Sequence, residues 1–135
     1  MVTVKEIYDE LNRIAPFSLQ EGYDNSGLIV GSGDKSVTRV LMALDITKDV
    51  AEEAVKSGCD LVISHHPVIF NGLKSLEHEN PAVILAAGGV SAICMHTNFD
   101  SAAGGMNDIL CDRLGLTPDE ALAVENGISI GYVCT

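Results

Sequence analysis

The sequence has 135 residues, the usual size of one domain, and 47% of them are hydrophobic and mostly aliphatic. Such a composition can bury a core of helices packed on a sheet, and it argues against a disordered chain. Nineteen acidic residues against eight basic ones give a formal net charge of −11, which repels phosphate backbones and argues against nucleic-acid binding over a broad face.

The N-terminal half of the chain begins with a predicted helix. Apolar residues at spacings of three and four predict this helix over residues 4–14. Thr3 and Glu6 form the pattern of a capping box at its start, and Pro16 ends it. The other elements expected in this half are strands over 28–30 and 40–44 and a helix between Thr47 and Gly58.

The C-terminal half continues the alternation of strands and helices. Asn80 followed by Pro81 is typical of a helix start, and this helix is expected to end at Gly88 and Gly89. The long polar connection over residues 67–79 is a candidate lid or oligomer contact. The other elements expected here are strands over 61–63, 90–95 and 128–134, a helix over 106–114, and a short turn opened by Thr117 and Pro118.

Short, continuous apolar strands that alternate with helices are typical of a largely parallel sheet covered on both faces. We therefore predict a single layered α/β/α domain over residues 1–135, with a mixed, largely parallel sheet.

The weakly polar run over residues 83–95 is too short to span a membrane, and no signal peptide is visible. None of the four cysteines lies in a CxxC pair, so we expect reduced thiols and a cytoplasmic protein.

Polar side chains follow three of the predicted strands. Asp45 follows one strand, His65 and His66 follow the next, and His96 follows a third, with Asp100 shortly after it. In open α/β sheets, ligands bind beyond the carboxyl ends of the strands. We therefore expect these side chains to share one edge of the sheet and to form the functional site.

His65 and His66 are the strongest candidates for metal ligands. Adjacent side chains on an extended segment point to opposite sides, so this pair suits two ions, one for each ring. Pro67 favours an extended His66, and the two oxygens of Asp100 could bridge two cations. Mixed imidazole and carboxylate ligation suits Zn, Mn, Fe, Co or Ni and does not choose among them.

Other polar residues are candidates for the surroundings of the metals or for a substrate pocket. His96 could be a ligand, a group behind a ligand, a proton carrier or a structural residue. Asp45 could instead cap the helix that follows it, and Asp24 with Asn25 could simply form a turn. Asn98, in the same segment as His96, belongs to this group of candidates.

Two segments are distinctive: DLVISHHPVIF over residues 60–70 and HTNFD over residues 96–100. Together with DNSGL over 24–28, LMALDIT over 41–47, GGMND over 104–108 and LGL over 114–116, they cover nearly the whole chain. In this order they resemble the Nif-three-like family, whose members are often labelled GTP cyclohydrolase 1 type 2 homologs.

The resemblance implies an α/β sandwich, often assembled into a ring-shaped hexamer, and a site for two divalent metals. Three of the family's ligands match His65, His66 and Asp100, with the aspartate bridging. Family members are considerably longer and supply a further His and Glu from a late helix. The resemblance therefore implies that this chain is the N-terminal portion of such a protein and holds only part of the site.

Two functions follow from these expectations. The first is a dinuclear-metal hydrolase that acts on a nucleotide or a phosphorylated small molecule. The second is a non-catalytic metal-binding protein that serves as an oligomeric scaffold or regulator. The sequence leaves open whether the chain is an enzyme.

Overall fold

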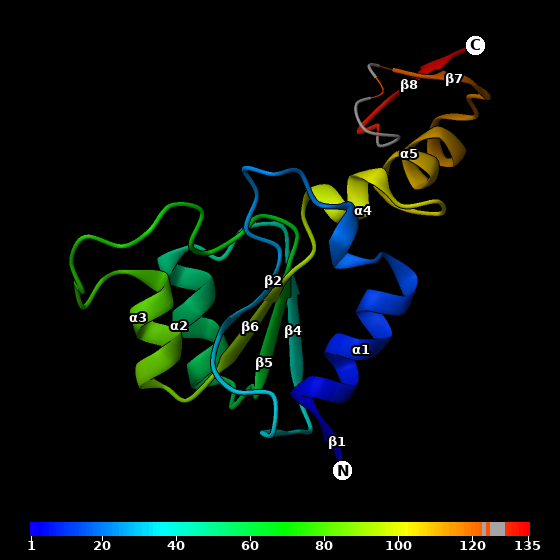
Figure 1. The fold of residues 1–135 in the computed structure, drawn as a ribbon. Coiled ribbons are helices and arrows are strands. Elements are labelled where there is room, and N and C mark those ends of the chain that lie inside the picture. The colour runs from blue at the N-terminus through cyan, green and yellow to red at the C-terminus, as the bar shows by residue number, and fades with distance from the viewer. Residues whose placement is uncertain (123, 125–128) are drawn as a thin grey trace.

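The computed structural model describes residues 1–122, 124 and 129–135 (Figure 1). Its centre is a four-stranded sheet in the order β2-β6-β5-β4. The strands are β2 (Gly27–Val30), β4 (Val40–Ala43), β5 (Leu61–Ser64) and β6 (Ser91–Cys94). β4, β5 and β6 run parallel, whereas β2 pairs antiparallel with β6. The predicted mixed, largely parallel sheet is therefore confirmed.

Helices cover both faces of this sheet (Figure 1). The helices α2 (Lys48–Lys56) and α3 (Pro81–Ala87) pack together on one face, and α1 (Val4–Ile14) lies on the other. The capping box of α1 forms as expected, because Thr3 Oγ1 accepts from the Glu6 N–H and the Glu6 carboxylate accepts from the Thr3 N–H. Thr47 caps α2 with its side chain alone, which accepts from the Val50 N–H.

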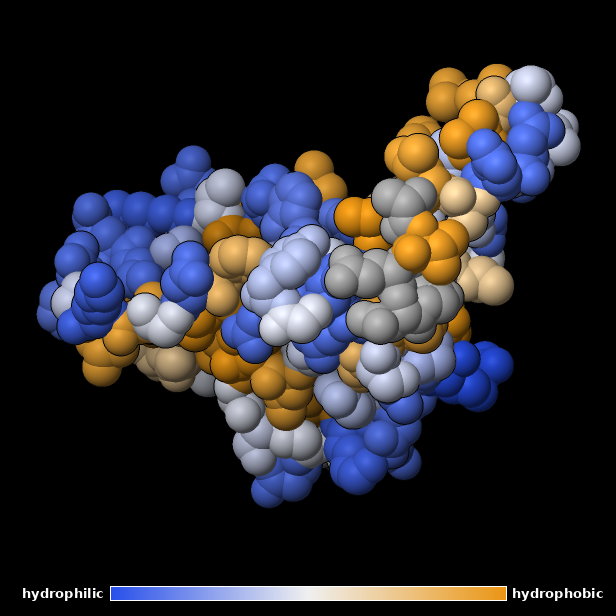
Figure 2. Space-filling view, turned by 45° about the horizontal axis from the view of Figure 1, so that its top comes forward, coloured by the Kyte–Doolittle hydropathy of each residue, from blue (hydrophilic) through white to orange (hydrophobic). Residues whose placement is uncertain are grey.

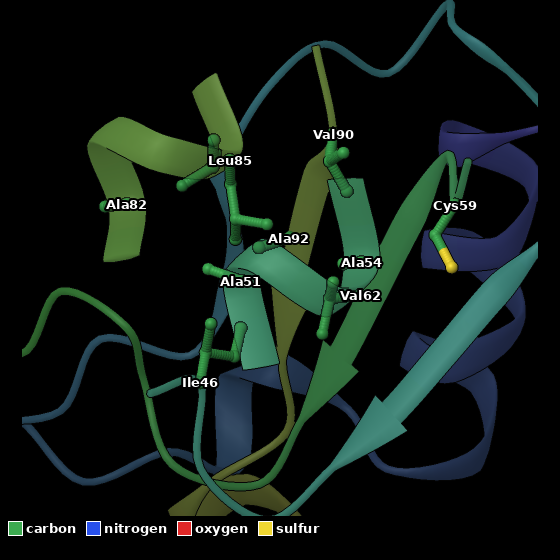
Figure 3. Close-up of a cluster of buried hydrophobic side chains, with 10 residues drawn as sticks. Ile46, Ala51, Ala54, Cys59, Val62, Ala82, Leu85, Val90 and Ala92 are labelled. Atoms are coloured by element: carbon green, nitrogen blue, oxygen red, sulfur yellow. The ribbon is translucent and has the colours of Figure 1, made fainter. Parts of the chain in front are cut away.

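The core divides into two clusters, one on each face of the sheet. The first lies between α2, α3 and the sheet (Figure 3). There, Ala51 and Ala54 of α2 leave room for Leu85 of α3 to pack against the strands. The second cluster lies on the α1 face and includes the fully buried side chains of Leu61 and Ile93. Burying each large aliphatic side chain contributes roughly 1.5–3 kcal/mol, so both faces support the sheet.

Two small strand pairs lie outside the central sheet. β1 (Val2–Thr3) pairs with β3 (Ser36–Val37), and neither was predicted because two-residue strands leave no periodic signal. β7 (Pro118–Ala121) pairs with β8 (Tyr132–Cys134). The short turn expected at Thr117 and Pro118 is therefore wrong, since this segment is extended. The predicted strand over residues 128–134 is confirmed for 132–134, while Ile128 lies outside the described residues.

A short helix, α4 (Thr97–Ser101), follows β6, where the sequence suggested only the end of a strand. α5 (Met106–Leu114) follows it with the predicted bounds.

α5 and the β7–β8 hairpin project away from the sheet (Figure 1), and this projection is rich in apolar side chains (Figure 2). Its exposed apolar residues include Ile109, Leu110, Leu114, Leu122, Ile130 and Val133. Within the described part of the chain, no helix has the length and apolar character needed to cross a membrane.

Candidate metal centre

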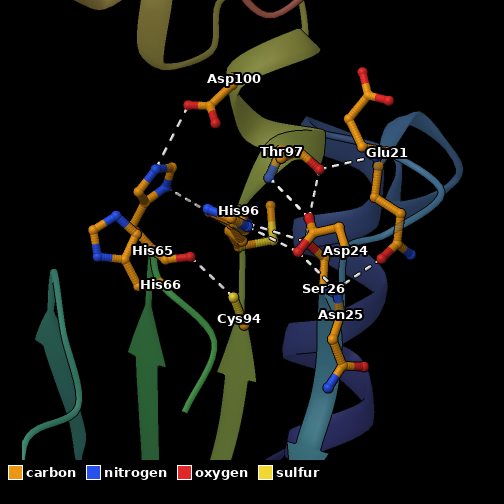
Figure 4. Close-up of polar contacts among 12 residues, drawn as sticks. Glu21, Asp24, Asn25, Ser26, His65, His66, Cys94, His96, Thr97 and Asp100 are labelled. Carbon is orange, nitrogen blue, oxygen red and sulfur yellow. Dashed lines mark hydrogen bonds and ion pairs between the residues drawn. The ribbon is translucent and has the colours of Figure 1, made fainter. Parts of the chain in front are cut away.

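Three histidines meet beyond the carboxyl ends of the parallel strands (Figure 4). His65 and His66 follow β5, and His96 follows β6. Their ring centroids form a triangle with sides of 5.0, 5.3 and 5.6 Å. One nitrogen from each ring lies within 4.8 Å of the others, so the three imidazoles form a group that could hold a metal ion.

The rings of His65 and His66 converge, although adjacent residues of an ideal strand would diverge. The reason is local: β5 ends at Ser64, and the next two residues lie in a bend. The Ser64 hydroxyl donates to the His66 carbonyl at 2.8 Å, and the His66 N–H donates to the Leu44 carbonyl at 2.9 Å. These bonds turn the chain so that both rings face the same edge of the sheet.

Each of the three histidines uses its Nδ1 atom for a hydrogen bond. His65 Nδ1 lies 2.8 Å from the Met95 carbonyl oxygen, His66 Nδ1 lies 2.6 Å from Asp45 Oδ1, and His96 Nδ1 lies 2.8 Å from Asp24 Oδ1. A carbonyl or carboxylate oxygen can only accept, so the proton of each neutral ring sits on Nδ1. The lone pair of each Nε2 is then free to bind a cation. Metal-binding histidines commonly have such partners behind them.

Asp24 is the most deeply placed of these partners, with a side chain that is 0% exposed. Burial alone would raise the pKa of Asp24, but hydrogen bonds from Thr97, His96, the Asn25 N–H and Ser26 lower it to about 2. Thr97 donates to Asp24 through both its N–H and its hydroxyl. Asp24 is therefore a fixed negative charge behind His96 at neutral pH.

Asp100 completes the rim from α4 (Figure 4). Its Oδ1 lies 3.6 Å from His65 Nε2, which is too far for a good hydrogen bond. Two ligand atoms at about 2.0–2.1 Å from one tetrahedral ion lie about 3.3 Å apart. The separation of His65 and Asp100 is therefore close to that of two ligands of one cation. Their side chains are 15% and 21% exposed, so solvent reaches both only in part.

The other candidates from the sequence take different positions. Asp45 accepts from His66, and Thr47 rather than Asp45 caps α2. Asn25 turns outward, and its amide donates to the Ile69 carbonyl at 2.6 Å. Asn98 is fully buried and points into the core, where its amide donates to the Ala15 carbonyl at 2.8 Å.

Two further residues support the site, and sequence reasoning did not assign them a role. Thr97 is buried and holds Asp24, as described above. Cys94 lies below the histidines, and its thiol donates to the His65 carbonyl at 2.9 Å (Figure 4). Burial, together with the charge of Asp24, raises the pKa of Cys94 to about 12, so this thiol stays protonated. Thr97 lies in the HTNFD segment, but its contact with Asp24, 73 positions earlier, leaves no local signal. Cys94 lies in an apolar strand, which indicates only burial.

The surroundings of the cluster are apolar on one side. A groove of about 510 Å³ runs beside His65. It is lined mainly by apolar side chains of α1, α4, β4 and the residue after β4, among them Leu11, Ile14, Met42, Leu44 and Phe99. On another side, the ring centroids of Phe70 and His96 lie 6.2 Å apart, with the two rings nearly perpendicular. The connection over residues 67–79 therefore borders the histidines.

Comparison with known proteins assigns this architecture to a family. The family model for Duf34/NIF3 (NGG1p interacting factor 3) matches residues 2–135. The chain belongs to the Duf34/NIF3 family. It is 36% identical over 116 residues to the GTP cyclohydrolase 1 type 2 homolog of Clostridium perfringens. This alignment covers 83% of this chain and 44% of that protein. It is 46% identical over 104 residues to the GTP cyclohydrolase 1 type 2 of Helicobacter pylori, covering 74% of this chain and 42% of the relative.

Solved structures of other proteins share the fold of this Duf34/NIF3 chain. A hypothetical protein of Staphylococcus aureus superposes with a TM-score of 0.80 at 38% identity, over 86% of this chain and 34% of that one. Reduced HcgD from Methanocaldococcus jannaschii superposes with a TM-score of 0.82 at 29% identity, over 89% of this chain and 50% of that one. This Duf34/NIF3 chain thus spans no more than half the length of these relatives.

Proposed function

We propose that this chain binds a divalent metal through His65, His66, His96 and Asp100. The observation that supports this most is the shared arrangement of the three histidines. Each ring is oriented by an acceptor at Nδ1, and each leaves its Nε2 for a cation. A purely structural histidine needs no such convergence of lone pairs, which repel one another unless a cation or proton lies between them.

The donor set fits a divalent transition metal. Imidazole nitrogen with one carboxylate oxygen suits Zn, Mn, Fe, Co or Ni. The carboxylates of Asp24 and Asp45 lie behind two of the rings, where they strengthen the rings as ligands. Asp100 could bridge to a second ion, as the resemblance implies, with further ligands supplied by the longer family protein.

We further propose that the site serves hydrolysis of a nucleotide or another phosphorylated small molecule. A bound metal would polarise a substrate oxygen and lower the pKa of a coordinated water. The names of the curated relatives, GTP cyclohydrolase 1 type 2 and its homologs, favour a nucleotide. The net charge of −11 would repel such an anion, and a local cation would offset this repulsion at the site.

Metal retention provides the first test. The purified chain is loaded with each metal in turn, dialysed and analysed for bound metal, alongside His65→Ala, His96→Ala and Asp100→Ala. We expect each variant to lose at least about tenfold in affinity. His78→Ala is the matched control, because His78 is exposed and lies in the connection over residues 67–79. Equal metal content in the wild type and in all three site variants would contradict the proposal.

Turnover provides the second test and separates the two functions. Loss of GTP and of a simple phosphomonoester is followed with and without metal, for the wild type and for Asp100→Asn. Metal-dependent loss of either substrate that Asp100→Asn abolishes would support a hydrolase. Retention of metal without turnover would instead favour the non-catalytic role.

A further inference from the structure

A pair of thiols joins two elements far from the histidines. Cys111 lies in α5, and Cys134 lies in β8. Their sulfur atoms are 3.4 Å apart, within contact distance, and both cysteines are free. Cys111 is buried, with 7% exposure, whereas Cys134 is partly exposed. No local pattern predicts this pair, because the two residues are separated by 23 positions.

This thiol pair sits where the hairpin meets α5. The Asn107 amide of α5 donates to the Ile130 carbonyl at 2.9 Å, next to β8. Asp108, one turn before Cys111, contributes with burial to raising the pKa of Tyr132 in β8. Cys111 and Cys134 therefore lie at the contact between the hairpin and α5.

We propose that Cys111 and Cys134 form a reversible disulfide site that locks the β7–β8 hairpin onto α5 when a small-molecule disulfide is present. Because Cys134 is the more exposed thiol, its thiolate attacks one sulfur of the small disulfide. A mixed disulfide forms, and one small thiolate leaves and takes up a proton. Cys111 then loses its proton and attacks the Cys134 sulfur, which releases the second small thiol. Two protein thiols are oxidised and one small disulfide is reduced to two thiols.

The setting of the pair makes this site selective. The hydrogen bond with Cys134, burial, and the charges of Asp108 and Asp112 all raise the pKa of Cys111. Cys111 therefore reacts slowly with reagents in solution, yet it lies against the one sulfur it has to attack. The other cysteines, Cys59 and Cys94, are both buried in the main body of the domain. Oxidation is thus directed to a single pair.

The disulfide would also affect a contact that reaches Asp100, at the edge of the sheet where the histidines lie. The Asn107 amide that donates to Ile130 also donates to the Asp100 carbonyl at 2.9 Å. One side chain therefore connects the hairpin to the backbone of the residue that faces His65. Locking the hairpin on α5 holds one of the two acceptors, the Ile130 carbonyl, within reach of Asn107.

The test is equilibration of the purified chain in mixtures of oxidised and reduced glutathione. After free thiols are blocked, peptide mass spectrometry quantifies each disulfide. We expect the Cys111–Cys134 pair to form at least about tenfold more readily than any other pair, and about tenfold less readily in denaturing urea. Oxidation should also slow amide exchange in α5 and β8.

Cystamine, a cationic disulfide, should react several-fold faster than oxidised glutathione at low salt, because Asp108 and Asp112 attract it.

Two variants control for the position of the thiol. Cys134→Ser should give only a mixed disulfide or no reaction. The double variant Val133→Cys with Cys134→Ser moves the thiol by one residue, to the opposite side of β8, and should not bond to Cys111. Equal cross-linking of this double variant and the wild type would overturn the proposal. So would a wild-type disulfide that forms equally well in urea, or one that joins other cysteines instead.

Discussion

His96 Nδ1 lies 2.8 Å from Oδ1 of Asp24, a residue 72 positions earlier in the chain. Five groups donate to this buried carboxylate: the His96 ring, the Thr97 N–H and hydroxyl, the Asn25 N–H and the Ser26 hydroxyl. This contact fixes the tautomer and direction of the His96 ring. The loop over residues 21–26 therefore shapes the candidate metal centre although it supplies none of the proposed ligands.

Replacing Asp24 by Asn tests this relationship. In the variant, the amide NH₂ would replace one carboxylate oxygen and face N–H and O–H groups that need an acceptor. We therefore expect the free energy of unfolding to fall by roughly 2 kcal/mol or more. Metal affinity should fall roughly 10- to 100-fold, because His96 loses its orienting partner. Urea unfolding and calorimetric metal titration measure the two effects. Asp34→Asn, in an exposed turn, is the control, and an Asp24→Asn protein that matches it in both measurements would argue against the role.

The lowered pKa of the Asp60 carboxyl predicts that the free energy of unfolding falls in acid. The Thr38 N–H, the Thr38 hydroxyl and the Arg39 N–H all donate to its carboxylate and lower its pKa from 3.8 to about 2. A lowered pKa in the folded state stabilises the fold above about pH 4, and this contribution disappears as the pH falls from about 4 to 2. Asp60→Asn should therefore destabilise the protein at pH 7, by roughly 1 kcal/mol, and have little effect near pH 2.

Urea unfolding of both proteins between pH 7 and pH 2 checks this expectation. The difference in unfolding free energy should shrink within the stated window. A difference that stays constant down to pH 2 would show that Asp60 acts through packing rather than through its charge.

Cys94 should be chemically inert in the folded protein. Burial raises its pKa to about 12, and only the thiolate is a good nucleophile. At pH 8, iodoacetamide should modify Cys94 only at the rate of unfolding, whereas the partly exposed Cys134 should react faster. Peptide mass spectrometry over a time course distinguishes the two sites. Rapid labelling of Cys94 in native buffer, at the rate seen in urea, would contradict its burial.

Gly105 allows its backbone to lie close to the backbone carbonyls of Phe99 and Ala102 at the end of α4. A Cβ atom added there would lie 2.0 Å from the Phe99 carbonyl oxygen and 2.7 Å from that of Ala102. Gly105→Ala should therefore shift the end of α4 and destabilise the protein by roughly 1–3 kcal/mol. The same variant should weaken metal binding, because α4 carries Asp100.

Gly72→Ala is the matched control, since a Cβ at Gly72 meets nothing within 4 Å. Thermal unfolding and metal titration of the two variants separate the effects. If Gly105→Ala and Gly72→Ala have the same midpoint of unfolding, the close approach does not contribute to stability.

The elements that the sequence predicted well are those specified by neighbouring residues. The capping box at Thr3, the Asn80–Pro81 helix start and the bounds of α5 all depend on side chains a few positions apart. α4 was missed because its five residues are too few for a helical period. The segment over 118–121 was misassigned because its extended form depends on pairing with β8, across a connection that no local pattern describes.

For the candidate metal centre, the sequence by itself determined which residues reach the rim, because parallel strands place their carboxyl ends together. His65, His66, His96 and Asp100 could all be named on that ground. Only the tertiary structure decided how they are oriented. The bend after Ser64 turns two adjacent rings to one side, and the partners of His66 and His96 lie 21 and 72 residues away. Such contacts depend on how distant segments pack together, which spacing along the chain does not encode.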